Sequence, residues 1–193
     1  MQDPATSPHS DERFKRTVKR IAAEAYWLHT YQNAMDGMKG IYAVGLDFFR
    51  VSLNALKDAR LIRLIRALED DSQTASFWYL LKCNERLVSN AAKHGGLDLI
   101  ELKKVADGLV GIRNKTFVHI DKDGVFDPQS YYDAAGLTYD QIDRTVRGFW
   151  KTMRKLHLDV FGEERGIAAR SAVGAVSLPS GMAVEVEAIF LLK

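Results

Sequence analysis

The 193-residue chain contains a single cysteine, Cys83, which excludes an intramolecular disulfide and fits a reducing compartment. Its five histidines are scattered, and one thiol cannot complete the ligand spacing of a structural zinc site. No apolar run approaches the roughly 20 residues of a membrane-spanning helix. Phosphate-binding loops of the Walker or G-x-G-x-x-G type are also absent. We therefore expect no membrane contact, no metal and no cofactor.

The charge balance is nearly even, with 27 Lys and Arg residues against 25 Asp and Glu residues, a net charge of +2. This excludes a strongly basic, histone-like binder but leaves room for local basic patches. Apolar residues make up 47% of the chain and charged residues 27%, which is typical of a globular protein. The stretch before Arg16 has no apolar segment of the kind found in a secretory signal, so we expect a cytoplasmic protein.

Helical patterns dominate the middle of the chain, and we expect an all-α, up-and-down bundle of four to five helices over residues 10–162. Ser10 and Asp98 are candidate N-caps, and Thr138–Gln141 reads as a capping box. Apolar residues recur at steps of 3 and 4 in the last two helices. The expected helices cover residues 10–35, 41–68, 72–93, 98–116 and 138–162, with a loop at 121–136 and Cys83 in the core.

The two ends of the chain differ from this middle part. We expect residues 1–9, with two prolines, to form a disordered leader. In the tail, residues 163–193, Val184, Val186 and Ala188 alternate with glutamates, which is strand periodicity. The tail is thus interpreted as a small extension that forms a β-hairpin, a dimer arm or a disordered end.

One segment carries the residue types of a catalytic site. Arg113, Asn114 and His119 lie within seven residues, and Asp121 follows. Arginine offers a planar charge for phosphate, and histidine can transfer protons near neutral pH. RNA cleavage without metal needs both groups: one moves a proton and the other stabilises charge on the phosphoryl oxygens.

The spacing constrains the geometry of this segment. Six residues correspond to about 600° of a straight α-helix, so Arg113 and His119 would be about 120° apart around it. Either His119 lies beyond the helix end, or two copies of the segment meet across a dimer. Arg113 lies on a mostly apolar face of its helix, which indicates partial burial and an anionic partner. Glu69, Asp70 and Asp121 are the candidate partners.

Arg113-Asn114 followed by His119 resembles the arginine–polar residue–histidine motif of the HEPN superfamily of helical domains. The resemblance covers about residues 12–162, and the order of its segments is similar to that of the abortive-infection U-type branch. The segments that carry it are Asp47–Arg50, Leu61–Leu64, Arg113–Lys115, His119–Asp121 and Leu137–Thr138.

The resemblance implies a ribonuclease fold, often a homodimer with both motifs facing a shared cleft. It also implies that Arg113 and His119 form the catalytic pair and that Asn114 positions them. Members of the family often act as toxins or antiphage effectors that are restrained by a partner protein. Other members have lost activity and only bind.

Additional candidates for substrate binding have ordinary structural explanations as well. Lys115 and Asp121 flank the catalytic candidates, and Asp121 can orient His119 or bond to the loop backbone. Arg144, Arg147 and Lys151 form a basic stripe on the last helix, which is either a solvated face or a track for the RNA backbone. Arg60, Arg63 and Arg66 invite the same two interpretations, although their spacing of three prevents all of them from facing one ligand.

The sequence therefore predicts a metal-independent endoribonuclease that acts on RNA, as a toxin or antiphage effector. The alternative is a non-catalytic module that binds a nucleotide, RNA or a partner, such as an antitoxin or a nucleotidyltransferase-type protein. A third interpretation is a structural domain in which Arg113 forms a salt bridge and His119 stabilises a helix end.

Overall fold

The computed structural model describes residues 8–39, 47–117 and 129–162, and every regular element among them is helical. The expected all-α bundle is therefore confirmed. The predicted tail, 163–193, and residues 1–7 of the predicted leader lie outside the described residues. The elements are α1 (Pro8–Gly37), α2 (Asp47–Leu68), α3 (Phe77–Cys83), α4 (Glu85–Gly95), α5 (Leu99–Ile112), the π-helix η2 (Arg113–Phe117), α6 (Gln129–Ala134) and α7 (Tyr139–Phe161).

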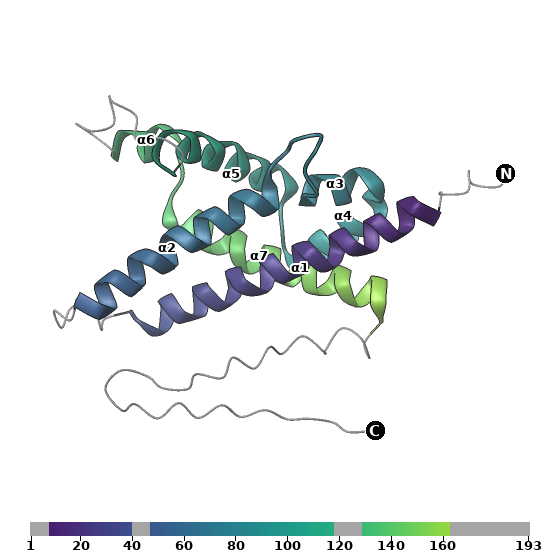
Figure 1. Ribbon diagram of the computed structural model, residues 1–193, viewed down its shortest axis with the longest axis horizontal. Helices are drawn as coiled ribbons and strands as arrows, with labels where there is room; N and C mark the ends of the chain where they lie inside the picture. Colours follow the sequence, from purple (N-terminus) through teal and green to yellow (C-terminus); the bar gives the residue numbers. More distant parts are fainter. Residues whose placement is uncertain (1–7, 40–46, 118–128, 163–193) are drawn as a thin grey trace, which may run out of the picture.

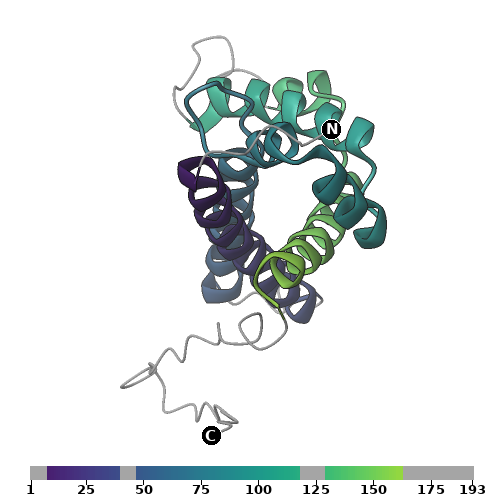
Figure 2. The same ribbon diagram turned by 90° about the vertical axis from the view of Figure 1, so that its right-hand side faces the viewer.

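Three long helices, α1, α2 and α7, form the body of the bundle (Figure 1). α7 packs along α1 on one side and along α4 on the other, while α2 runs beside α1. α5 crosses the C-terminal part of α2 and is followed by η2, and α6 lies beside α5. Viewed along the bundle, the helices surround one common centre (Figure 2). None of the helices in these three described stretches is long and apolar enough to span a membrane.

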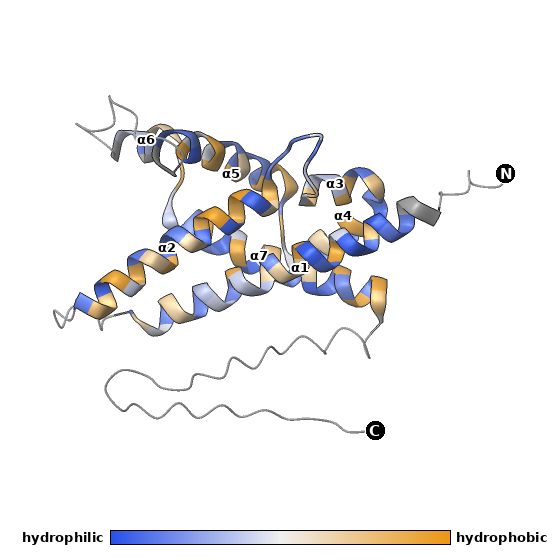
Figure 3. Cartoon of the chain, in the orientation of Figure 1, coloured by the Kyte–Doolittle hydropathy of each residue, from blue (hydrophilic) through white to orange (hydrophobic). Residues whose placement is uncertain are grey.

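The core forms where the predicted apolar stripes face inward. Bands of apolar and polar residues alternate around the helices (Figure 3). Most of the side chains that were predicted to share a face are buried on α5 and α7, and Val160 near the end of α7 is partly buried. On α5 the buried side chains are Leu102, Val105, Leu109 and Ile112, and on α7 they are Ile142, Val146, Phe149, Met153 and Leu156.

Both ends of α7 follow the sequence prediction. The Thr138 hydroxyl accepts a hydrogen bond from the Gln141 amide at 3.2 Å, and the Gln141 side chain accepts one from the Thr138 amide at 2.8 Å. This reciprocal capping box satisfies two N–H groups that would otherwise lack partners. At the other end Gly162 adopts a φ of +78°, which favours glycine and stops the helix.

The prediction of one continuous third helix over residues 72–93 is wrong. Asn84 divides it into α3 and α4, with a φ of −149°, and its side chain accepts a hydrogen bond from the Leu87 amide at 3.1 Å. This asparagine serves as the N-cap of α4 because its short polar side chain satisfies the helix terminus. Cys83 at the break is exposed, so the prediction that it belongs to the core is also wrong.

Two further boundaries differ from the prediction. α1 begins at Pro8, two residues before the predicted cap Ser10, so Pro8 and His9 are helical. Proline fits the first turn of a helix because its missing N–H would have no partner there. The predicted loop at 121–136 contains the short helix α6, which begins directly after Pro128.

Alanine substitutions at two glycines are expected to have opposite effects on the stability of the bundle. A Cβ atom on Gly95 would lie 2.3 Å from Thr152 Oγ1 and 2.7 Å from the Thr152 amide nitrogen, where α4 touches α7. We expect Gly95→Ala to destabilise the protein by about 1–3 kcal/mol, the typical cost of overpacking. Gly111→Ala is the matched control, since a Cβ there has nothing within 4 Å. It should stabilise helix α5 by roughly 0.5–1 kcal/mol. Urea denaturation checks both, and a stability of Gly95→Ala equal to wild type would contradict this packing.

Candidate functional site

The predicted catalytic segment begins where α5 changes its helical type. Arg113 follows Ile112, the last residue of α5, and opens the π-helix η2, which ends at Phe117. π-helical turns are rare and occur frequently at functional sites. The 120° separation expected for Arg113 and His119 assumed a regular α-helix, and that assumption fails over residues 113–117. The angular argument therefore no longer fixes how the two side chains are related.

Arg113 has two partners among the described side chains. Its Nη1 donates to Glu69 Oε1, and its Nε donates to Asn114 Oδ1 at 3.0 Å. The side chains of Arg113 and Glu69 are 29% and 30% exposed, so the predicted partial burial is confirmed. Of the two candidate partners among the described residues, Glu69 binds Arg113 and Asp70 does not. Asp70 instead binds Lys82 at 3.0 Å and Lys103 at 3.2 Å.

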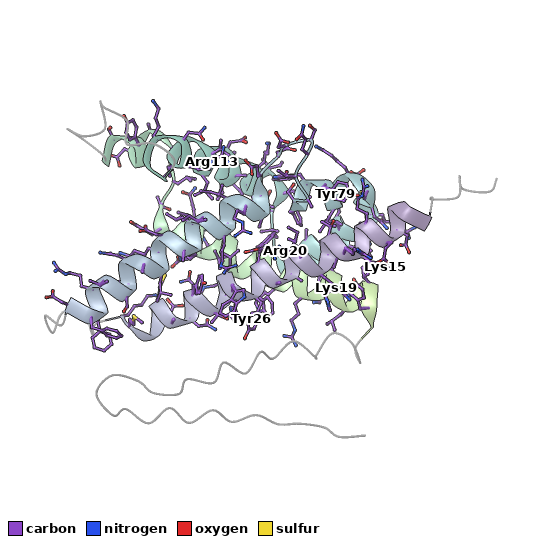
Figure 4. The ribbon with its side chains drawn as sticks, in the orientation of Figure 1. Lys15, Lys19, Arg20, Tyr26, Tyr79 and Arg113 are labelled. Atoms are coloured by element: carbon purple, nitrogen blue, oxygen red, sulfur yellow. The ribbon has the colours of Figure 1, made fainter. Side chains whose placement is uncertain are left out.

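These contacts use only part of the donor capacity of Arg113. A guanidinium carries five N–H groups, and the two contacts engage two of them. Glu69 lies directly after the end of α2, so the pair connects α2 to the end of α5. Figure 4 shows Arg113 near the end of α5, beside α2. The two contacts hold the guanidinium plane in one orientation, and no contact between described residues uses the remaining N–H groups, which suit a second acceptor such as phosphate.

Lys115 lies on the same π-helix and approaches α6. Its ammonium is 5.7 Å from the ring centroid of Tyr131, a cation–π distance. Tyr131 lies within the predicted loop 121–136, and it belongs to α6 instead. His119 and Asp121 lie outside the described residues, so their roles stay predictions.

The side chains of the predicted basic stripe on α7 make contacts that do not involve Arg113. Arg147 binds Asp36 of α1 at 2.6 Å, and Arg144 Nε donates to the backbone oxygen of Asp140 at 3.3 Å. Lys151 is exposed. Among the contacts between described residues, none of these three side chains touches Arg113 or its partners. The structure thus does not bring the stripe together with the Arg113 group.

A second group of arginines was not recognised as a unit from the sequence. The carboxylate of Glu24 on α1, only 5% exposed, binds Arg20 at 3.2 Å, Arg63 at 2.7 Å and Arg66 at 3.4 Å. The available signal was the spacing of Arg13, Arg16 and Arg20 by 3 and 4 residues, which places them on one helical face.

Arg60, the remaining member of the series on α2, points elsewhere. It is 1% exposed and bonds to Gln32 of α1 and, at 2.5 Å, to Asp143 of α7. The prediction that Arg60, Arg63 and Arg66 do not share one ligand is confirmed. Arg60 fits neither of the two interpretations, since it is buried and is neither on a solvated face nor available to RNA.

Within the described ranges, no three His, Cys, Asp or Glu side chains gather in a way that could hold a metal ion. No family model matches the chain, and comparisons with curated proteins and with solved structures gave no match. The resemblance to the HEPN superfamily rests on the sequence motif and the order of its segments.

Proposed function

We propose that the protein is a metal-independent endoribonuclease of the HEPN type. The observation that carries this proposal is the state of Arg113: a half-buried guanidinium at a π-helical turn, oriented by Glu69 and Asn114, with N–H groups that no contact between described residues uses. Such a group is suited to binding a phosphoryl oxygen and stabilising the charge that develops there. His119, six residues later, supplies the group for proton transfer.

The proposed reaction uses the RNA's own nucleophile. The 2′-oxygen attacks the adjacent phosphorus, the bond from phosphorus to the 5′-oxygen breaks, and a 2′,3′-cyclic phosphate remains. One proton leaves the 2′-hydroxyl and one proton is delivered to the departing 5′-oxygen. His119 is assigned to this proton transfer, Arg113 to the phosphoryl oxygens, and Asn114 to positioning Arg113. Lys115, whose ammonium lies near the Tyr131 ring, is assigned to a neighbouring phosphate.

The cellular role follows from the same resemblance. We propose a toxin or antiphage effector that works as a homodimer and is restrained by a partner protein, an antitoxin or a nucleotidyltransferase-type protein. Expression of the wild-type chain should then slow growth of the host cell, and His119→Ala should relieve this effect.

The test is cleavage of a mixed pool of single-stranded and structured RNA in the presence of EDTA, with wild type beside His119→Ala. We expect fragments with 2′,3′-cyclic phosphate and 5′-hydroxyl ends from wild type only. Equal cutting by both proteins would refute the assignment of His119. Fragments with 3′-hydroxyl ends would refute the reaction, because an external nucleophile would then have attacked.

The contact between Arg113 and Glu69 also favours a second candidate function. A carboxylate already neutralises this guanidinium, as expected for a non-catalytic module that binds a nucleotide, RNA or a partner protein. RNA binding that is tight and salt-dependent, without cleavage by wild type, would establish this binding module in place of the nuclease.

A further inference from the structure

The five arginines Arg13, Arg16, Arg20, Arg63 and Arg66 form what we name the arginine surface, on α1 and the C-terminal half of α2. We infer that this surface is a second phosphate-binding site, separate from Arg113, which holds the backbone of a single-stranded nucleic acid. The inference goes beyond the proposed nuclease because it concerns binding alone and would hold for a protein that does not cut.

At the centre of the surface, three arginines share one carboxylate, so these contacts leave a net positive charge. Arg20, Arg63 and Arg66 converge on the one carboxylate of Glu24. Three like charges held around a single anion repel one another, and a second anion from solution relieves that repulsion. The Arg20 and Arg66 side chains are 62% and 52% exposed, so both can reach such an anion while they remain beside Glu24.

The surface continues along α1 into a groove. Arg16 pairs with Glu12 at 2.8 Å and is 79% exposed, and Arg13 reaches the phenol of Tyr79 on α3. The groove runs between α1 and the segment that precedes α3. It is lined by Glu12, Arg13, Arg16, Thr17, Arg20 and Ala75. Five arginines thus share two carboxylates, Glu12 and Glu24, in these contacts, which is the charge pattern of a site for a polyanion rather than for one small ion.

Aromatic side chains beside the arginines favour nucleic acid over an acidic peptide. The guanidinium of Arg63 lies 5.6 Å from the ring centroid of Trp27 and 5.5 Å from that of Tyr31. Burial works to lower the pKa of Arg63, but hydrogen bonds to Glu24 and Tyr31 outweigh it and raise the pKa, which keeps the charge fixed. Arginines with half-buried aromatic rings beside one of them suit a strand whose phosphates bind cations and whose bases stack.

The surface lies next to the Arg113 group in the fold. Glu69, the partner of Arg113, follows Arg66 by three residues, which is about one helical turn. Figure 4 shows Arg20 on α1 and Arg113 near the end of α5, with the C-terminal end of α2 between them.

The test measures binding of a short fluorescein-labelled oligouridine with 2′-O-methyl groups, which no attack by a 2′-hydroxyl can cleave. Arg20→Gln/Arg66→Gln removes two exposed charges and leaves Arg63 on Glu24. Its matched control, Arg50→Gln/Lys104→Gln, removes two exposed charges from pairs within α2 and α5. Fluorescence anisotropy of the full chain then gives affinity as a function of salt.

We expect the double variant to bind roughly 10- to 30-fold more weakly than wild type at about 0.1 M monovalent salt. The slope of log affinity against log salt should fall by about 1.4, from two lost phosphate contacts at about 0.7 each on a single strand. The control should bind within about 2-fold of wild type, because its charges lie off the surface. Equal weakening of both variants would overturn the inference, as would no oligouridine binding by wild type or preferential binding of polyglutamate.

A second measurement needs no variant and covers the case in which the double variant fails to fold. Wild-type protein is irradiated with an oligonucleotide that contains 4-thiouridine, and the cross-linked peptides are mapped. Adducts on α1 or the C-terminal half of α2, at Trp27 or Tyr31 above all, support the site. Adducts confined to α7 overturn it. Because neither experiment requires RNA cleavage, the proposed nuclease can fail while this site stands, and the reverse also holds.

Discussion

Replacing Arg113 with lysine should slow RNA cleavage by roughly 10²–10³-fold, the usual cost of losing one donor to a developing oxyanion. Lysine keeps the positive charge but not the planar arrangement of N–H groups. Arg113 uses Nη1 for Glu69 and Nε for Asn114, and no contact between described residues uses its remaining N–H groups. A lysine ammonium that stays beside Glu69 cannot present the same fixed geometry to the phosphoryl oxygens.

The loss should reside in kcat rather than in KM, because the charge on phosphate develops in the transition state. Glu69→Gln should also slow cleavage, since Glu69 positions Arg113. The matched control is Asp70→Asn, which removes the same charge one residue later from a carboxylate bound to Lys82 and Lys103. Single-turnover cleavage rates at saturating RNA measure all three. Unchanged cleavage by Arg113→Lys, together with a lowered melting temperature, would assign Arg113 a structural salt bridge only.

Asp143→Ala should lower the free energy of unfolding by about 3 kcal/mol, at the lower end of the range for breaking a buried ion pair. Its partner Arg60 is 1% exposed, whereas Asp143 is 25% exposed, so part of the pair remains hydrated. The Nε of Arg60 is buried without a hydrogen-bond partner among the described residues. Without Asp143, Arg60 would keep only Gln32, a neutral acceptor.

The control for this prediction is Asp159→Ala on the same helix. Asp159 pairs with Lys155 four residues earlier on α7, and exposed pairs of this kind contribute about 0.3–0.5 kcal/mol. Urea denaturation gives both values, provided that the slope of the unfolding free energy with urea stays constant. Equal stability of the two variants would show that Arg60 does not depend on Asp143 in solution.

The parts of the fold that local chemistry determines could be predicted. The stripes of α5 and α7 repeat every 3 to 4 residues, and the caps Asp98 and Thr138 act within one helical turn. The break at Asn84 could not be predicted, because asparagine at the centre of an apolar helical pattern costs little by itself. Packing of α3 and α4 on other helices decides whether the chain turns there.

The candidate site could be predicted in part. The sequence indicates that Arg113 needs an anionic partner and offers Glu69 among three candidates, but only the path of α2 past α5 selects it. The sequence also could not show that Arg60 is buried whereas Arg63 remains partly exposed. Residues three apart on one helix differ by about 60° in direction, and the neighbouring helices determine which of the two is buried. The link between this segment and RNA stays a prediction.

The π-helical turn at the end of α5 changes how the spacing between Arg113 and His119 can be interpreted. A π turn closes its hydrogen bond one residue later than an α turn, so η2 acts as a local insertion in the helix. The five residues of η2 therefore differ in register from the same residues of an α-helix. A chain that is one residue shorter here can recover the α-helical register and still bring a later side chain to a similar place. The number of residues between the arginine and the histidine therefore does not by itself determine how the two side chains are arranged. Helices with different separations can carry equivalent pairs.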